Sequence, residues 1–407
     1  MNQPVFLHIV ERLEGFLGKL PESIQRPVLK ELTPMKELFL KQRAPRFVLT
    51  GSHKLPVHEV AASLFAFDTP ADLRDVLMEV FRWQNITVAG TGTVTVLDAR
   101  GADEAAMRKV EEELKREPAD MFLHLVDGNS GRPVLSRDID ALATLTRLNG
   151  SGDSAAKIVG ISLVAPRNVS PDANGRSPTG ERRDAQAKLQ TALADKPGLR
   201  EHLLQVLELP IQPLDAASAS ASPAAARLMA LLSRELPNEA RVEMIRVSRD
   251  REAQTEIAQV LVKSTSAISA AIGAQPIPLA DLPILTTLQL VMISGIMHIA
   301  GRERSLRAAT EFAAALGVNV GAGMILREGT RAVLKFFPGW GNVVCGMVAG
   351  AGTYAVGRAA TVYFLEGVSL SDARRAYRMN RRRSERSPLR GEQPRLTGRA
   401  ERKIKQP

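Results

Sequence analysis

Apolar and polar positions along the chain follow two different periods, and the change between them divides the sequence. Over residues 1–44 apolar side chains recur at helical spacing, interrupted by Pro21 and Pro27. From Arg46 onward short apolar runs alternate with helical stretches; the runs read FVLTG, NITVAGT, TVTVLDARG, DMFLHLVDG and KIVGISLVAP. The pattern predicts a few short helices over 1–44 and then a region of alternating strands and helices.

The alternating region has the sequence pattern of an α/β domain. Its helical stretches lie near 57–66, 103–116, 136–148 and 181–209. Strands that alternate with helices form a mostly parallel sheet with helices on both faces. The runs NITVAGT and GTVTVLDARG share a Gly-containing turn and predict one antiparallel hairpin in that sheet. We therefore expect an α/β domain over 45–225, ending in the low-complexity segment PLDAASASASPAAA.

Beyond this segment the chain is helical in pattern and increasingly apolar, which predicts an all-α domain over 226–370. Residues 282–301 and residues 336–357 contain no charged side chain, and each stretch is long enough to span a bilayer. Embedding in a membrane, or close association with one, is therefore expected. Buried helical hairpins in a soluble domain have the same pattern and remain the alternative.

Small residues and a histidine within these apolar stretches suggest how the helices pack. Gly317 with Gly321, and Gly346 with Gly350, lie four residues apart and would let two helices approach closely. We interpret His298 as a hydrogen-bonded core residue rather than a ligand.

Charge is distributed unevenly between the body and the C-terminal end. The chain has a net charge of +10, and 371–407 hold thirteen Lys/Arg and four Asp/Glu, or +9, which leaves +1 for the first 370 residues. A nearly neutral body argues against a broad nucleic-acid-binding face. The segment 371–407 is predicted to be a disordered basic tail that binds anionic lipid or an acidic partner, with RNA as an alternative.

The single cysteine, Cys345, excludes a disulfide framework and a thiolate metal cluster, and we expect it to be buried. The first residues, MNQPVFLHIVERLEGF, lack the pattern of a secretory signal. Both observations favour a protein that stays inside the cell.

The first stretch with candidate chemistry is FVLTGSHKLPVH, a strand, a glycine turn and the start of a helix. A phosphate loop of the form G-x-x-x-x-G-K-[ST] uses backbone N–H groups, a lysine and a hydroxyl at this place. With Gly51 as the first glycine, the other three positions hold Pro56, Val57 and His58. None of them has the required chemistry; Lys54 or Ser52 would substitute only along a different backbone path.

Two further stretches bear on nucleotide binding. A strand that ends in D-x-x-G, here Asp98 to Gly101, is where a GTPase places an aspartate near Mg²⁺ and a glycine near the γ-phosphate. A guanine-specificity motif should follow the strand KIVGISLVAP. The residues available there are Ala165, Pro166, Arg167 and Asn168, and none supplies the carboxylate that guanine recognition needs.

Together these stretches resemble the Era-like bacterial GTPases that carry a C-terminal apolar helical domain of unknown function. The resemblance rests on KQRAPRFVLTG, VHEVAASLFAF, TVTVLDARGADE, ADMFLHLVDG and PIPLADLPILTTLQLVMISGIM, in this order over about residues 30–367. It implies a P-loop GTPase-like α/β domain with a mostly parallel sheet, followed by the helical domain. It also implies GTP and Mg²⁺ as ligands and a role at a membrane or with a partner protein.

Only Gly51, Asp98 and Gly101 carry over from the family's site, with Asp98 as the metal-side residue. The phosphate-loop lysine and hydroxyl and the base-specificity motif are absent, and no threonine in 68–95 can be assigned to the switch that closes over Mg²⁺. We therefore expect a pseudo-GTPase that binds GTP weakly at most and does not hydrolyse it efficiently.

The expected role is a membrane-associated scaffold or regulator at the cytoplasmic face of the inner membrane, partnered by itself, by a membrane protein or by an active homologue. An active GTPase with a non-standard loop is one alternative. A soluble interaction protein without a nucleotide role is the other.

Overall fold

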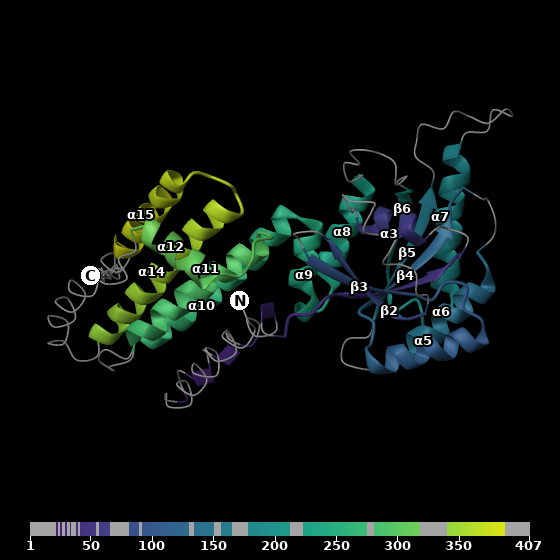
Figure 1. Ribbon diagram of the computed structural model, residues 1–407, viewed down its shortest axis with the longest axis horizontal. Helices are drawn as coiled ribbons and strands as arrows, with labels where there is room; N and C mark the ends of the chain where they lie inside the picture. The colour runs from purple at the N-terminus through teal and green to yellow at the C-terminus, as the bar shows by residue number, and fades with distance from the viewer. Residues whose placement is uncertain are drawn as a thin grey trace, which may run out of the picture.

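The chain folds into a sheet body and a helical bundle that lie end to end (Figure 1). The computed structural model describes residues 41–53, 57–65, 81–88, 92–129, 134–149, 156–164, 178–211, 223–274, 281–317 and 340–386, with a few single positions between 22 and 39. The purple N-terminal segment reaches the sheet from the side of the bundle, so both ends of the sheet body's chain lead toward the bundle.

The sheet has six strands in the order β2-β3-β1-β4-β5-β6. The strands are β1 Arg46–Gly51, β2 Trp83–Val88, β3 Gly92–Asp98, β4 Met121–Asp127, β5 Lys157–Val164 and β6 Leu203–Pro210. All neighbouring pairs are parallel except β2 and β3, which form the antiparallel hairpin with Asn85 opposite Thr95. Both the mostly parallel sheet and its hairpin are confirmed.

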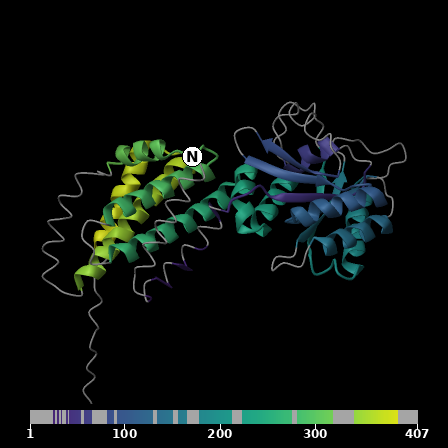
Figure 2. The same ribbon diagram turned by 60° about the horizontal axis from the view of Figure 1, so that its bottom comes forward.

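Helices cover both faces of the sheet (Figure 2), and the strands are therefore buried on both sides. One layer consists of α3 Val57–Phe65, α8 Pro223–Glu235 and α9 Asn238–Ser248, which share an apolar core with the sheet. The other layer consists of α5 Glu104–Arg116, α6 Ser136–Leu148 and α7 Pro178–Asp195. Because the central strands are parallel, their C-terminal ends lie at the same edge of the sheet, and this is the edge where a binding site can form.

Two sequence predictions need correction in this body. The stretch 181–209 is not one helix, because α7 ends at Asp195 and residues from Leu203 form strand β6 beside β5. The expected boundary at 225/226 falls inside α8, whose Leu228 and Leu232 are buried in the sheet core. The packing of the α/β body thus continues through α9.

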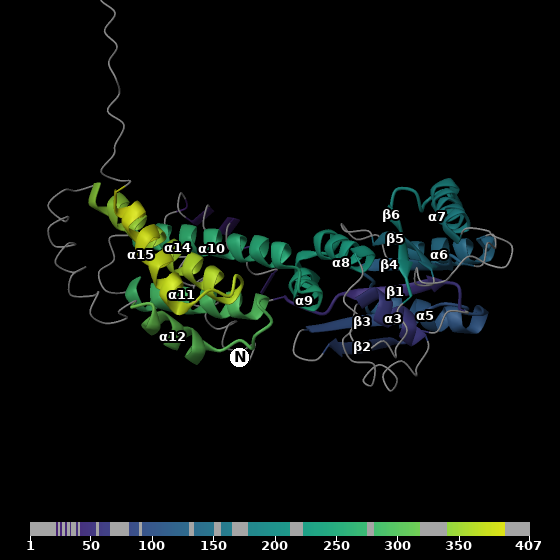
Figure 3. The same ribbon diagram turned by 90° about the horizontal axis from the view of Figure 1, so that it is seen from above.

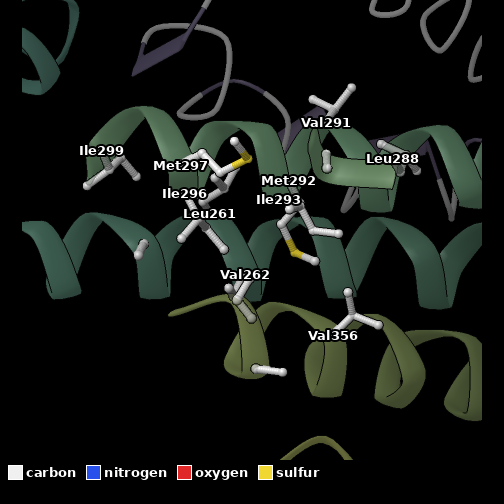
Figure 4. Packing of buried hydrophobic residues seen from close by; sticks show 14 of the residues in the cluster. Leu261, Val262, Leu288, Val291, Met292, Ile293, Ile296, Met297, Ile299 and Val356 are labelled. Carbon is white, nitrogen blue, oxygen red and sulfur yellow. The ribbon is translucent and has the colours of Figure 1, made fainter. Parts of the chain in front are cut away.

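The bundle contains long, tightly packed helices. They are α10 Arg251–Gly273, α11 Asp281–Ile299, α12 Leu306–Ala315, α14 Trp340–Phe364 and α15 Leu370–Arg386. Figure 4 shows Leu261 and Val262 of α10 between Met292 of α11 and Val356 of α14. This shared apolar core explains the scarcity of charge in the sequence of α11 and α14.

Glycines set the close approach of α10 and α14, as the spacing of Gly346 and Gly350 predicts. A Cβ on Gly346 would lie 2.7 Å from the Ala270 carbonyl oxygen, and one on Gly350 2.9 Å from the Ala270 Cβ. Gly317 lies directly after α12 with φ +75°, and among the described residues no heavy atom lies within 4 Å of its Cβ position. Its partner Gly321 lies outside the described residues.

The basic segment after residue 370 is not wholly disordered, which corrects the prediction for its first part. Residues Leu370–Arg386 form α15, and Ala373 and Tyr377 are buried against the bundle. These two residues lie one helical turn apart, so their small and aromatic side chains form the contact stripe. The rest of the predicted tail lies outside the described residues.

In the part of the chain that the structure describes, no helix is both long enough and apolar enough to cross a bilayer. The predicted spans 282–301 and 336–357 correspond, as far as they are described, to α11 and α14 of the bundle. The expectation that either stretch spans a membrane is therefore not supported by these helices. Cys345 lies in α14, and its side chain is outside the described residues.

Candidate nucleotide-binding site

The three residues predicted for a nucleotide site come together at the edge where β1 and β3 end. Leu49 is in register with Asp98, so Gly51 and Asp98 both lie at the C-terminal ends of adjacent parallel strands. Gly101 lies in the loop between β3 and α5 and contacts His53 of the loop after β1. The fold thus brings the three predicted residues together, and the contacts of each residue determine which ligands this edge of the sheet can bind.

Gly51 is required by the packing of the sheet itself. Its φ is +95°, and a Cβ there would overlap the carbonyl oxygen of Leu125 in β4. The Ser52 N–H donates to that same oxygen at 2.9 Å, which extends the pairing of β1 with β4 past the glycine. The Ser52 N–H therefore satisfies a strand carbonyl, whereas a phosphate loop needs its N–H groups to point at the ligand.

Gly101 also has a local structural reason. Its φ is +69°, and a Cβ there would lie 2.8 Å from the His53 Cβ. The left-handed backbone and the close contact both favour glycine at this position. The two loops that would enclose a γ-phosphate in a GTPase are packed directly against each other here.

Asp98 pairs with an arginine two residues along the chain. The Arg100 guanidinium donates from Nε to Asp98 Oδ1 at 2.8 Å and from Nη2 to Oδ2 at 2.9 Å, and the Arg100 backbone N–H donates to Oδ1 at 3.1 Å. Arg100 Nη1 also donates to the Ser52 carbonyl oxygen at 3.3 Å. The side chains of Arg100 and Asp98 are only 3% and 10% exposed. Both carboxylate oxygens are thus bonded to an internal cation.

The sequence contains a signal for this pair that the motif D-x-x-G does not include. Residues two apart at the end of a strand project to the same side. In the stretch LDARG this places the arginine beside the aspartate, and a planar guanidinium matches a carboxylate bidentately. The pair was missed because the motif D-x-x-G leaves its two middle positions unspecified.

A row of buried polar side chains crosses the central strands on the face covered by α5, α6 and α7. Thr50 Oγ1 lies 3.0 Å from His124 Nδ1, and burial lowers the pKa of the fully buried His124 to about 4. His124 is therefore neutral near pH 7. Within the described residues, His124 Nε2 and Ser162 Oγ have no hydrogen-bond partner. This row lies beneath the site and adds no charge to it.

Several predicted positions lie where the structure gives no side-chain description. These are Lys54, Pro56, Val57, His58 and the residues 165–168 after β5. Among the described residues, no group of three or more His, Cys, Asp or Glu side chains is placed to hold a metal ion. The residues that are described do not fit Mg²⁺, because the carboxylate expected on the metal side is occupied by a guanidinium.

No model of a known protein family matches the sequence, and no curated protein matches it significantly. Among solved structures, Toc33 from Arabidopsis thaliana as a dimerization-deficient mutant is similar at 11% identity, over 58% of this chain and 96% of that chain, with a TM-score of 0.34. Toc33 in complex with Mg²⁺ and GMPPNP is similar at 11% identity, over 57% of this chain and 96% of that chain, with a TM-score of 0.33.

A bacterial dynamin pair described in connection with membrane tethering is similar at 10% identity, over 95% of this chain and 77% of that chain, with a TM-score of 0.27. At these identities and scores, none of the likenesses bears on what this chain binds. The architecture itself, with the strand order β2-β3-β1-β4-β5-β6, one antiparallel edge hairpin and helices on both faces, is that of a GTPase-like α/β domain, followed here by a helical bundle.

Proposed function

We propose that this chain is a degenerate GTPase-like protein that acts as a scaffold or regulator without efficient GTP hydrolysis, and that it works at a membrane surface. The observation that carries the first part is the Asp98–Arg100 pair. An aspartate that assists Mg²⁺ must offer an oxygen to the metal or to its water. In this chain both oxygens accept from the guanidinium and the backbone N–H of Arg100.

The surrounding residues support the same conclusion. Catalysis of phosphoryl transfer depends on a lysine and a metal ion that neutralise the developing charge. The phosphate-loop positions hold Pro56, Val57 and His58 instead. Arg100 supplies the positive charge at this edge, but it is bound to Asp98 and to the Ser52 carbonyl. We expect GTP binding to be weak at most and independent of Mg²⁺.

Titration of the full chain with mant-GTP, with and without Mg²⁺, tests this proposal. We expect no Mg²⁺-dependent binding and no phosphate release. Binding that requires Mg²⁺, with phosphate release that Asp98→Asn abolishes, would instead establish the active GTPase with a non-standard loop. The matched control is Glu112→Gln on the exposed face of α5, which removes a negative charge away from the site.

The membrane part of the proposal rests on the surface of α14 and α15. Arg375 and Arg378 of α15 are exposed on the side away from the buried Ala373. On α14, Met347 and Val348 are 43% and 48% exposed, which is high for large apolar side chains. Exposed apolar residues and basic side chains on packed helices suit an anionic lipid surface, where the apolar groups enter the interface and the arginines meet headgroups.

Co-sedimentation with phosphatidylcholine vesicles, with and without phosphatidylserine, tests the membrane part. Each arginine near an anionic surface contributes about 1 kcal/mol, so Arg375→Gln with Arg378→Gln should weaken binding about 30-fold. The matched control is Arg108→Gln with Lys109→Gln on α5, which should leave binding unchanged. Equal loss in both variants, or no binding to anionic vesicles, would favour the soluble interaction protein.

A further inference from the structure

One helix, α9, belongs to both halves of the molecule. Ala240, Met244 and Val247 are buried in the core of the sheet body, whereas Val242 and Ile245 are buried in the core of the bundle. Figure 3 shows α9 between the two halves. An α-helix that is apolar on opposite sides is held by both neighbours. The contact between the halves is therefore a packed junction.

A cluster of polar side chains closes this junction beside α9. Gln42, from the segment that leads into β1, donates from Nε2 to Glu243 Oε1 of α9 and lies 3.0 Å from His298 Nε2 of α11. Its Oε1 accepts from Arg304, which also donates to the Phe39 carbonyl oxygen at 3.4 Å. One amide thus joins the N-terminal segment, the sheet body and the bundle.

The hydrogen-bond roles in this cluster follow from its chemistry and from the tautomer of His298. A carboxylate accepts only, so the Gln42 nitrogen must face Glu243, and its second N–H then points to His298 Nε2. His298 Nε2 also lies 3.6 Å from Glu243 Oε1, and it accepts from Gln42 in the tautomer that carries the ring proton on Nδ1. Burial lowers the pKa of His298 to about 4, so the ring is neutral near pH 7. In this tautomer Gln42 donates to both Glu243 and His298 and accepts from Arg304.

Glu243 also reaches the β2–β3 hairpin at the edge of the sheet. Its Oε2 accepts from the Thr93 N–H at 3.3 Å, and a Cβ on Gly92 would lie 2.8 Å from the same oxygen. Its Oε1 accepts from Arg246 at 2.8 Å. The two oxygens of one carboxylate therefore contact the hairpin on one side and, through Gln42, the bundle on the other.

We propose that Glu243 and Gln42 form a relay that couples the position of the β2–β3 hairpin to the orientation of the helical bundle. A shift of the hairpin at Gly92 and Thr93 removes the Thr93 N–H from Glu243. The carboxylate then changes position, which alters its hydrogen bond with Gln42 and the contact of Gln42 with His298. The relay needs no nucleotide and so stands apart from the function proposed above. A protein or surface that engages either half would act on the other.

Such coupling is reciprocal, because a change at one end alters the free energy of the other by the same amount. Perturbing the bundle side should therefore loosen the hairpin, and perturbing the hairpin should loosen the bundle side. A junction that is only structural would respond locally. This difference separates a relay from simple packing.

Hydrogen exchange of the full chain provides the test. His298→Ala removes the acceptor on α11 and should speed exchange of the Thr93 amide about tenfold, while Leu123 in the sheet core stays unchanged. Gly92→Ala crowds Glu243 from the hairpin side and should speed exchange at the C-terminal end of α11. If His298→Ala does not fold, His298→Gln replaces it; its amide oxygen can still accept, so a smaller acceleration is expected.

The matched control is Glu239→Gln on the same helix. The Glu239 side chain has an ion contact with Arg43 at 3.9 Å, and the Glu239 carbonyl oxygen accepts from the Arg43 N–H at 2.9 Å, a bond that the substitution leaves in place. This variant changes a different side chain of α9 and should leave exchange at Thr93 and α11 as in the wild type. Acceleration confined to the mutated side in both His298→Ala and Gly92→Ala would overturn the relay.

Discussion

Removing the partner of the buried Asp98 should destabilise the sheet body strongly. In Arg100→Met the methionine approximates the length of the arginine stem but leaves the carboxylate without its guanidinium. Because the two side chains are 10% and 3% exposed, water cannot replace the lost bonds. Breaking a buried ion pair from one side costs about 3–5 kcal/mol. Asp98→Leu should cost a similar amount by leaving Arg100 unpaired.

The double variant Asp98→Leu with Arg100→Met makes this prediction sharp. Replacing both partners of a buried pair by apolar residues is often close to neutral. We therefore expect the double variant to lose less stability than either single variant, with a coupling energy of about 2 kcal/mol or more. Substantial coupling would show that the aspartate is committed to the arginine.

Urea unfolding followed by tryptophan fluorescence measures these changes. The chain has two tryptophans, and Trp83 in β2 reports the sheet, where its Nε1 donates to the Glu113 carbonyl oxygen at 3.2 Å. A Trp340→Phe background removes the second signal. A cost below about 1 kcal/mol for Arg100→Met, or additive single effects, would refute the reasoning, since a solvated pair behaves in that way.

Three further predictions test the packing and the buried histidine. In α14, Gly357→Ala should destabilise the bundle by about 1–3 kcal/mol because its Cβ would lie 2.6 Å from the Val262 side chain of α10. Gly352→Ala should stabilise it by up to about 1 kcal/mol, since no heavy atom of the described residues lies within 4 Å of that Cβ position; thermal unfolding by circular dichroism compares the two variants. Gly51→Ala should destabilise the sheet body by at least about 2 kcal/mol in urea, and a smaller loss would show that β4 can move away. Since burial holds the pKa of His124 near 4, against 6.5 when unfolded, its stabilising contribution is complete above pH 6.5 and falls by up to about 3 kcal/mol as the pH drops toward 4; His124→Leu should flatten this part of the stability profile.

The sequence predicted the sheet body well where local signals agree. The hairpin was predicted from a Gly-containing turn between two β-type runs, and both strands form as expected. Strand β6 was missed because Leu203, Val206 and Leu207 also fit a helical period. Apolar spacing alone cannot distinguish the two in so short a run. Pro197 and Gly198, which interrupt the run before β6, were the stronger signal.

Contacts between distant parts of the chain could not be predicted in the same way. The predicted site residues Gly51, Asp98 and Gly101 do come together, because parallel strands end at a common edge. The sequence does not show that the Arg100 side chain points toward Asp98 and donates to both of its carboxylate oxygens. The cluster around Gln42 joins residues more than two hundred positions apart, with no local pattern to mark it. The α15 segment was predicted to be disordered from its charge, but packing by Ala373 and Tyr377 overrides this tendency.

The double burial of α9 also orders the events of synthesis. While the chain emerges from a ribosome, one apolar face of the sheet stays uncovered until α8 and α9 have been made. The sheet body can therefore complete its fold only once synthesis has reached about Ser248. At that moment Val242 and Ile245 still face outward and present a ready surface to the helices that follow. The sheet body thereby acts as a template on which the bundle assembles. A nascent chain halted before α10 would expose Val242 and Ile245 to chaperones.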